Sequence, residues 1–307
     1  ARLCVRGRDL LYDFCDRFRV PSRRLGKLIV AQAGEEQQLA GIQARATANG
    51  VQLQPLDQAQ LGRLEPRLQG KAALFSPQTG IVDSHQYMTA LLHQARQHGA
   101  ELALHCRVLR AIPLSTGGLE LHTENGKERQ AYRLQCDTVI NAAGLQAQAV
   151  ASTVQGLDQD SIPRLYPCKG DYFAYRGNSP VSRLVYPVPE PQARGLGIHC
   201  TLDLGGQLRF GPDSDYVDSL DYQVAPQKAA LFASAVARYL PGITAEKLLP
   251  AYAGIRPKLA GPGQPQADFH IQDASEHGIA GLIQLFGIES PGLTASLALA
   301  EEVAARV

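Results

Sequence analysis

Residues 137–151 read DTVINAAGLQAQAVA, and this segment indicates the fold more clearly than any other part of the chain. The apolar residues 138–140 predict a buried strand. The residues Ala142, Ala143 and Gly144 then predict a tight turn before a helix over residues 145–154. At such a turn a ligand can lie against bare backbone near a helix N-terminus. Small residues also occur there for tight packing alone, so both interpretations stay open.

On either side of this segment the hydrophobic pattern alternates between helical and strand periods. The pattern predicts helices over residues 3–18, 35–49, 58–63, 85–98, 226–240 and 290–307. It predicts strands over residues 27–31, 102–112, 119–123, 132–135, 171–177, 183–188, 196–202, 206–211 and 280–287. Because α/β segments alternate with mainly antiparallel ones, we expect a mixed α/β and α+β fold with two interleaved domains.

The composition is that of a globular chain whose partners are small molecules or copies of itself. Its 307 residues are 45% hydrophobic, and 30 basic against 29 acidic side chains leave a formal net charge of +1. With no long run of one sign, nothing attracts a nucleic acid or an anionic membrane surface. No apolar stretch reaches the roughly 18 residues of a membrane span. The six cysteines form no C-x-x-C pair, so we expect reduced thiols, no metal site and a cytoplasmic location.

The last segment of the chain, IESPGLTASLALAEEV at 288–303, predicts a helix with an open N-terminus. Ser290 suits the N-cap and Pro291 the first helical position. Gly292, Leu293 and Thr294 place no carboxylate in the first turn. Such a terminus carries about half a positive charge and free N–H donors, which would suit an anion or a reduced flavin ring. An ordinary capped surface helix is the alternative.

Two further segments carry candidate chemistry. In AYAGIRPKLAGPG, at 251–263, Arg256 lies between a glycine and a proline in a strand, where its planar fork could hold a substrate carboxylate or form an internal salt bridge. The segments 163–177 and 184–212 contain Lys169-Gly170, which could lie beside a ring, and Tyr172, Tyr186 and His199, which could line a pocket. Strand tyrosines and histidines are more often structural, and that alternative stays open.

Taken in order, these segments resemble the D-amino-acid-oxidase-type superfamily of flavoproteins over nearly the whole chain. The motifs KLIVA, CKGDYF, YPVPEP, GIHCTLDLGGQLRFGPD and ESPGLTASLALAEE resemble its L-2-hydroxyglutarate dehydrogenase-like branch. The resemblance implies FAD as the cofactor and hydride transfer from the substrate α-carbon to the flavin, giving a 2-oxo acid. It implies an FAD-binding Rossmann-like domain at 1–20, 84–155 and 251–307, interleaved with an antiparallel-sheet substrate domain at 21–83 and 156–250.

The resemblance also implies roles for particular residues. Arg256 would hold the substrate carboxylate, and Val108 would contact the adenine through its backbone. The residues that would lie beside the flavin or its chain are Ala142, Ala143, Gly144, Lys169, Gly170, Gly287, Ile288, Ser290, Pro291, Gly292, Leu293 and Thr294.

The sequence departs from the family pattern in one respect. The family opens with a strand, a G-x-G-x-x-G turn and a helix, which hold the pyrophosphate and ribose, and no such unit occurs here. The nearest string, GLGIHC, lacks the third glycine. We therefore expect an incomplete FAD-binding domain lacking roughly sixty residues, a fingerprint unit and its continuation. Whether FAD binds without that unit stays open.

Three functions compete. The leading one is an FAD-dependent oxidation of a small 2-hydroxy acid, for which His199 is the candidate base that takes the hydroxyl proton. The second is an amino-acid or amine oxidase of the same superfamily, which needs no such base. The third is a non-catalytic remnant that binds a carboxylate. The exact substrate, the electron acceptor (oxygen or a quinone) and the oligomeric state stay open.

Overall fold

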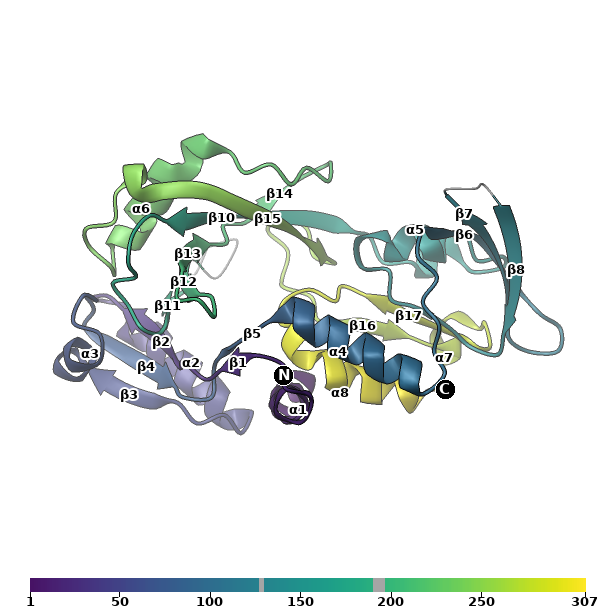
Figure 1. Cartoon of the computed structure of the whole chain (residues 1–307), viewed down its shortest axis with the longest axis horizontal. Helices are drawn as coiled ribbons and strands as arrows, with labels where there is room; N and C mark the ends of the chain where they lie inside the picture. Colours follow the sequence, from purple (N-terminus) through teal and green to yellow (C-terminus); the bar gives the residue numbers. More distant parts are fainter. Residues whose placement is uncertain (127–129, 190–196) are drawn as a thin grey trace. The chain divides into compact units, whose positions relative to one another are not determined.

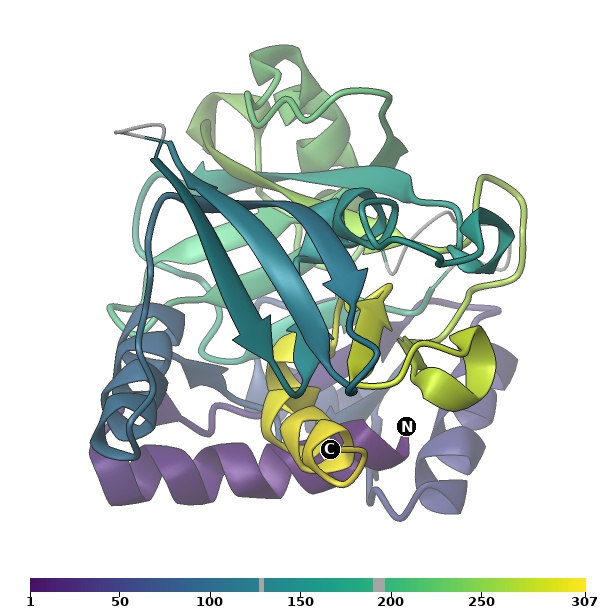
Figure 2. The same cartoon turned by 90° about the vertical axis from the view of Figure 1, so that its right-hand side faces the viewer.

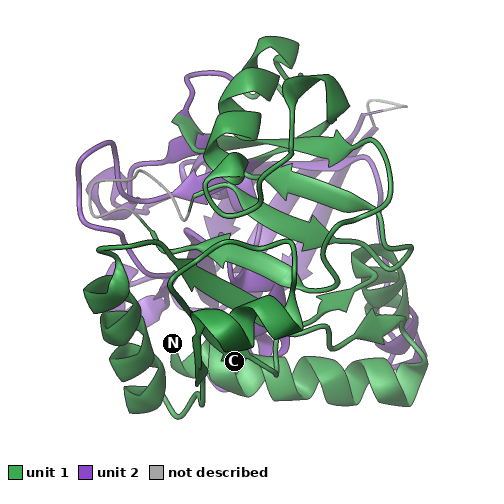
Figure 3. Ribbon diagram, turned by 90° about the vertical axis from the view of Figure 1, so that its left-hand side faces the viewer, with its two compact units in different colours: residues 1–92, 169–215, 220–254 green, residues 93–168, 216–219, 255–307 purple. Residues whose placement is uncertain are grey.

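The computed structural model describes residues 1–126, 130–189 and 197–307, which form two compact units interleaved along the chain (Figure 3). Unit 1 comprises residues 1–92, 169–215 and 220–254, and unit 2 comprises residues 93–168, 216–219 and 255–307. The interleaving agrees with the expected chain organisation, but these boundaries differ from those of the predicted domains. The predicted assignment of cofactor and substrate roles to the domains stays a prediction. The end of YPVPEP and the start of GLGIHC lie outside the described residues.

The main sheet has nine strands in the order β14-β10-β13-β12-β11-β2-β4-β3, with β15 also paired to β10 (Figure 1). In chain order the strands are β2 (Lys27–Ala31), β3 (Gln54–Asp57), β4 (Ala72–Ser76), β10 (Tyr166–Tyr175), β11 (Leu184–Pro187), β12 (His199–Leu202), β13 (Leu208–Gly211), β14 (Asp215–Tyr216) and β15 (Leu248–Lys258). Most neighbours are antiparallel, but β11 and β2 run parallel, with Tyr186 opposite Ile29. A two-stranded ladder joins β1 (Ser22–Arg23) to β5 (Ile81–Val82).

The core of unit 1 lies on one face of this sheet because alternate residues of its strands are apolar. Val185, Cys200, Phe210 and Phe173 come from four neighbouring strands and are fully buried in one cluster. Helix α6 (Ala229–Ala237) contributes Phe232, whose ring centroid lies 4.7 Å from that of Phe173. The residues between these core positions therefore project from the opposite face of the sheet.

Unit 2 contains two three-stranded sheets. In the first, β17 (Leu282–Phe286) lies between β16 (His270–Gln272), which is antiparallel to it, and β9 (Val139–Asn141), which is parallel. The second is an antiparallel meander of β6 (Cys106–Pro113), β7 (Leu119–Asn125) and β8 (Gln130–Cys136), seen as the three teal strands in Figure 2. Apolar residues such as Leu119, Ala147, Leu282 and Phe286 form the core of the unit.

Seven of the eight helices in the part of the chain that the structure describes correspond to predicted ones, whereas the sequence pattern did not predict the short helix at Ala274–His277. The helices are α1 (Arg2–Phe18), α2 (Glu36–Ala48), α3 (Gln58–Leu64), α4 (Ser84–Gln97), α5 (Ala147–Ala151), α6 (Ala229–Ala237), α7 (Ala274–His277) and α8 (Gly292–Ala304). Short 3-10 turns occupy Gly144–Gln146, Gln159–Ser161, Pro226–Lys228 and Ala245–Lys247. Among the described residues, no helix has the length and apolar character needed to cross a bilayer.

Three helix predictions were wrong at their ends. The helix predicted over residues 226–240 is α-helical only over Ala229–Ala237. The helix predicted over residues 145–154 stops at Ala151, because the backbone at Thr153 and Gln155 hydrogen-bonds Ala111 instead of continuing the helix. Ser290 was predicted as the N-cap of the last helix, but the N-cap is Pro291 and the helix begins at Gly292. The Gly292 N–H donates to the Glu289 carbonyl and closes a turn over residues 289–292. The helix therefore starts one residue later than predicted.

Candidate functional site

Two of the predicted cofactor segments follow two strands that lie side by side in unit 2. Strand β9 pairs in parallel with β17, with Val139 opposite Leu282 and Asn141 opposite Gln284. Residues 142–144 leave the carboxyl end of β9, and residues 287–294 leave the carboxyl end of β17. Since the two strands are parallel, both segments begin at the same edge of the sheet. Ligands of open α/β sheets bind at this kind of edge.

A buried amide contact joins the two strand ends. Asn141 is 4% exposed, and its Nδ2 donates to the Ala147 carbonyl at 2.8 Å and to Oε1 of Gln284 at 3.1 Å. Its Oδ1 accepts a hydrogen bond from the Ala143 N–H at 3.3 Å. These bonds hold the turn after β9 in place relative to β17. Asn141 and Gln284 were not predicted as site residues. The position of Asn141 at the end of a mostly apolar strand was a sequence feature that indicates such a residue.

Gly287 leaves bare backbone where the chain exits β17. Its φ of +67° lies in the left-handed region, and a Cβ there would stand 2.7 Å from Cγ of Leu259. Any side chain would therefore be both strained and obstructed. Gly144, after β9, also has a left-handed φ, of +58°.

No side chain of the first turn neutralises the N-terminus of α8, as predicted. The helix has no side-chain N-cap and no acidic residue in its first turn. The nearest acid along the chain, Glu289, is partly buried and pairs with Nζ of Lys258 at 2.8 Å. That pair neutralises the carboxylate, so the positive end of the helix dipole stays available to an anionic ligand group. Lys258 and Glu289 were not predicted as site residues.

Arg256 is partly buried near the end of β15. Its Nε donates to the Cys168 carbonyl at 3.3 Å, and one terminal nitrogen lies 3.7 Å from the Cys168 Sγ. Both of these partners are uncharged, and together they fix the plane of the guanidinium. An oriented guanidinium is the geometry that recognises a carboxylate through two parallel hydrogen bonds.

Val108 lies in β6, opposite Thr123 and next to an irregularity in the β6–β7 ladder between Val108 and Arg110. It therefore belongs to the meander and not to the sheet that carries the other predicted cofactor residues of unit 2. Its contact with an adenine stays a prediction.

In unit 1, three predicted pocket residues fall into one row across the main sheet. The register pairs Val185 with Cys200, His199 with Gly211, and Phe173 with Phe210. Tyr186 of β11, His199 of β12, Gly211 of β13 and Tyr172 of β10 are each one residue along from these pairs or within them, so they follow one another across the sheet. The rings of Tyr186 and His199 stack with centroids 3.4 Å apart and planes 13° apart. Tyr172 stacks in turn on Tyr252 of β15, with centroids 4.6 Å apart. We call these five residues the aromatic row.

His199, Gly211 and Tyr172 follow or precede the core residues Cys200, Phe210 and Phe173 along their strands, so they project from the opposite face of the sheet. Gly211 is required within the row, since a Cβ there would stand 2.8 Å from the Tyr172 ring. His199 is 5% exposed, whereas Tyr252 is 50% exposed. The row therefore runs from a buried histidine to an exposed tyrosine.

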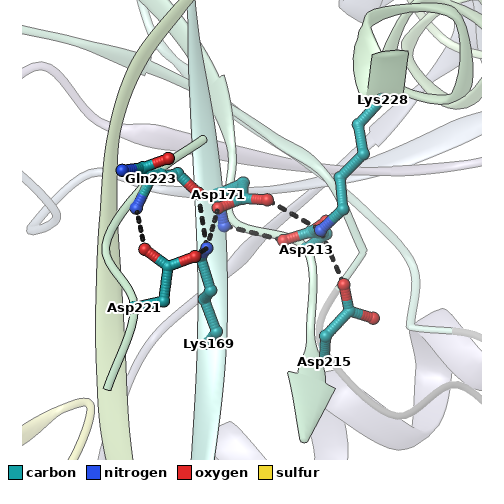
Figure 4. Close-up of polar contacts among 7 residues, drawn as sticks. All are labelled: Lys169, Asp171, Asp213, Asp215, Asp221, Gln223 and Lys228. Atoms are coloured by element: carbon teal, nitrogen blue, oxygen red, sulfur yellow. Dashed lines mark hydrogen bonds and ion pairs between the residues drawn. The ribbon is translucent and has the colours of Figure 1, made fainter. Parts of the chain in front are cut away.

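Lys169 and Gly170 begin the unit 1 part of β10, and Lys169 belongs to a charged network (Figure 4). The Lys169 ammonium donates to the Gln223 carbonyl and lies 3.7 Å from Asp171 and 3.9 Å from Asp221. Nearby, the Lys228 ammonium contacts Asp171 and Asp213 at 2.7 Å each and Asp215 at 2.6 Å. We call these seven residues the lysine–aspartate cluster. The predicted role of Lys169 beside a flavin stays a prediction.

The cluster holds Lys228 firmly in its charged form. Burial would lower the Lys228 pKa, but the hydrogen bonds that the ammonium donates to Asp171, Asp213 and Asp215 outweigh it and raise the pKa above the ordinary lysine value. Asp171 is fully buried, and its carboxylate contacts the Lys228 ammonium at 2.7 Å.

Comparisons with known proteins agree with this architecture. Residues 1–306 match the family model described as FAD dependent oxidoreductase. The chain is 38% identical to "L-2-hydroxyglutarate dehydrogenase, mitochondrial" of Arabidopsis thaliana, over 99% of this chain and 70% of that protein. Among solved structures it resembles L-alpha-glycerophosphate oxidase of Mycoplasma pneumoniae, with FAD bound, at a TM-score of 0.82 and 21% identity, over 97% of this chain and 77% of the other. Glycine oxidase of Geobacillus kaustophilus matches at a TM-score of 0.78 and 22% identity, over 99% of this chain and 78% of the other.

The chain thus has the fold of a flavin-dependent oxidoreductase. More particularly, it belongs to the FAD-dependent oxidoreductase family named for D-amino-acid oxidase, as the match over residues 1–306 shows.

The residues present fit the flavin end of FAD. The open N-terminus of α8 and the bare backbone at Gly287 and Gly144 suit a flat ring that gains negative charge on reduction. Residues that would cradle the pyrophosphate through a G-x-G-x-x-G turn do not occur in this sequence.

Proposed function

We propose that this protein oxidises a small 2-hydroxy acid of the L-2-hydroxyglutarate type to the corresponding 2-oxo acid. The observation that carries the proposal is the 38% identity, over 99% of the chain, with a plant enzyme named L-2-hydroxyglutarate dehydrogenase. FAD, when bound, supplies the acceptor for the hydride that leaves the substrate α-carbon. The residues of this chain then have to hold the acid in place and remove the hydroxyl proton.

In this proposal Arg256 binds the carboxylate next to the reacting carbon. Its guanidinium is held by the backbone carbonyl and the thiol of Cys168, so its orientation is set before the substrate arrives. A preorganised fork loses less entropy on binding than a flexible cation would.

The proposal assigns the hydroxyl proton to a ring nitrogen of His199. Stacking on Tyr186 limits rotation of the imidazole, and burial keeps bulk water away from it. The oxidation balances in atoms and electrons. The α-carbon loses a hydride, its hydroxyl loses a proton, and the C–O bond becomes a carbonyl. General base catalysis of this kind contributes about 10²- to 10⁴-fold to the rate.

Substitution of Arg256 in the full-length, FAD-loaded protein tests the proposal. We expect Arg256→Ala to weaken binding of L-2-hydroxyglutarate by about 2 to 5 kcal/mol, measured as a rise in KM, because a charge-assisted bidentate contact is lost. Arg256→Lys should fall well short of rescue, because an ammonium offers a point donor in place of the fork.

Arg133→Ala is the matched control, since Arg133 is an exposed arginine of the same unit. FAD occupancy and the melting temperature should stay near wild type in the Arg256 variants. A variant Arg256→Ala with unchanged kcat/KM toward 2-hydroxy and 2-amino acids would remove the residue from the site.

The amino-acid or amine oxidase remains the alternative outcome of the same experiment. It would be indicated by turnover of 2-amino acids with no turnover of 2-hydroxy acids. The cytoplasmic location and the choice of oxygen or a quinone as electron acceptor also remain proposals; the Arabidopsis relative is named as mitochondrial.

A further inference from the structure

Lys27 differs from the other buried or partly buried lysines among the described residues. Lys169, Lys228 and Lys258 each have a carboxylate oxygen within 4 Å. Lys27 is partly buried at the start of β2, and its ammonium makes no hydrogen bond or ion pair with the residues that the structure describes. Its contact is with the face of the Tyr186 ring, 4.7 Å from Nζ to the centroid.

An ammonium in this setting is poorly compensated. A cation over an aromatic ring gains about 0.5 to 2 kcal/mol, whereas removal of an ammonium from water costs several kcal/mol. Burial accordingly lowers the Lys27 pKa from its ordinary value, and an electrostatic contribution from Cys4 opposes this only in part. Among the described residues no carboxylate forms an ion pair with Lys27, so the ammonium would gain from an added anion.

The position of Lys27 connects it to the aromatic row. Lys27 lies over one face of the row's first member, Tyr186, and the ring of His199 stacks on Tyr186 as well. All three side chains belong to unit 1. Because His199 stacks on one face of Tyr186 and β11 lies between β12 and β2, the Lys27 ammonium lies over the other face of the ring. A cation and a buried imidazole separated by one flat ring suit the two ends of a short carbon chain that ends in a carboxylate.

We propose that Lys27 binds the side-chain carboxylate of a dicarboxylic substrate and so selects diacids over monoacids. This inference rests on the proposed oxidation of a 2-hydroxy acid, and it assigns the second carboxylate of that acid to a named residue. Tyr186 lies between Lys27 and His199, and the aliphatic carbons of the substrate pack along the edge of its ring.

The test compares Lys27→Met with wild type in the full-length, FAD-loaded protein. The substrates are L-2-hydroxyglutarate and L-2-hydroxypentanoate, which has the same number of carbons but lacks the second carboxylate. We expect the ratio of kcat/KM for the diacid to that for the monoacid to fall roughly ten- to hundredfold, the worth of one hydrogen bond to a charged group. Lys27→Arg should retain part of the preference.

Lys71→Met is the matched control, because Lys71 is an exposed lysine of the same unit, and it should leave the ratio unchanged. An equal loss for both substrates in Lys27→Met, or no change in the ratio, would overturn the inference.

A binding measurement separates this inference from the proposed function. Glutarate, a diacid that cannot be oxidised at a hydroxyl, is titrated into wild type and Lys27→Met by calorimetry. Binding that is lost in Lys27→Met supports the Lys27 site even if the wild type oxidises no 2-hydroxy acid, in which case the proposed function fails alone. Equal binding of glutarate to both proteins contradicts the Lys27 site whatever the activity.

Discussion

Unit 1 contains two lysines with opposite surroundings. Lys228 is held by three aspartates of the lysine–aspartate cluster (Figure 4), whereas Lys27 meets the face of a tyrosine ring. The surroundings raise the pKa of Lys228 and lower that of Lys27. A charged side chain that is paired with residues of the same protein stabilises the fold. A charged side chain without such a partner is a candidate for binding a ligand. The difference separates a structural region from a functional one in the same sheet.

The largest expected effect is on the structural side of this comparison. Lys228→Met leaves Asp171 fully buried without the ammonium that it contacts at 2.7 Å. Removing one partner of a buried ion pair costs about 3 to 5 kcal/mol of unfolding free energy. Urea denaturation of the full-length protein measures it, with Lys71→Met as the control. A loss below the error of the measurement would show that the cluster is dispensable.

The same contrast between fold and site can be drawn with two glycines of unit 2. Gly287 and Gly263 both have a left-handed φ, but a Cβ at Gly287 meets Leu259 while a Cβ at Gly263 meets nothing within 4 Å. Gly263→Ala should therefore cost only the backbone strain of about 1 to 2 kcal/mol. Gly287→Ala should cost about 1 to 3 kcal/mol more through overpacking and should also weaken FAD binding, which Gly263→Ala should not. Fluorescence titration with FAD distinguishes the two, and equal FAD affinities would place Gly287 outside the cofactor site.

The smallest effect concerns the pH dependence of stability. Because the Lys27 pKa is lowered in the folded protein, the unfolded chain binds more protons between that pKa and the ordinary value of 10.5. The penalty from Lys27 is thus fully present below the lowered pKa and disappears as pH rises through this window. Lys27→Met should be the more stable protein near pH 7, and its advantage should shrink toward pH 10.5. Thermal unfolding across this range checks the sign, and an advantage that grows with pH would contradict the assigned burial.

How much the sequence predicts depends on the range of the interactions involved. Strand 27–31, the turn at Ala142 and Gly144 and the open last helix follow local periods and small residues, and those predictions were confirmed within a few residues. The Ser290 cap was wrong because the turn bonds of the preceding loop decide where a helix starts.

The arrangement around His199 could not be predicted in the same way. It requires the order of strands in the sheet, and β2 pairs with β11 more than a hundred residues further along the chain. Tyr186, His199 and Tyr172 were named as pocket residues, but local patterns do not reveal that Tyr186 and His199 stack. Lys27 escaped notice for the same reason, since its missing partner is a property of the folded surroundings.

The most direct test of the account is anaerobic mixing of the full-length, FAD-loaded protein with L-2-hydroxyglutarate, with the flavin absorption spectrum and the product recorded together. The account predicts bleaching of the oxidised flavin bands and release of one 2-oxoglutarate for each flavin reduced. Flavin that stays oxidised with L-2-hydroxyglutarate and other 2-hydroxy acids, but bleaches with a 2-amino acid, would contradict the proposed reaction.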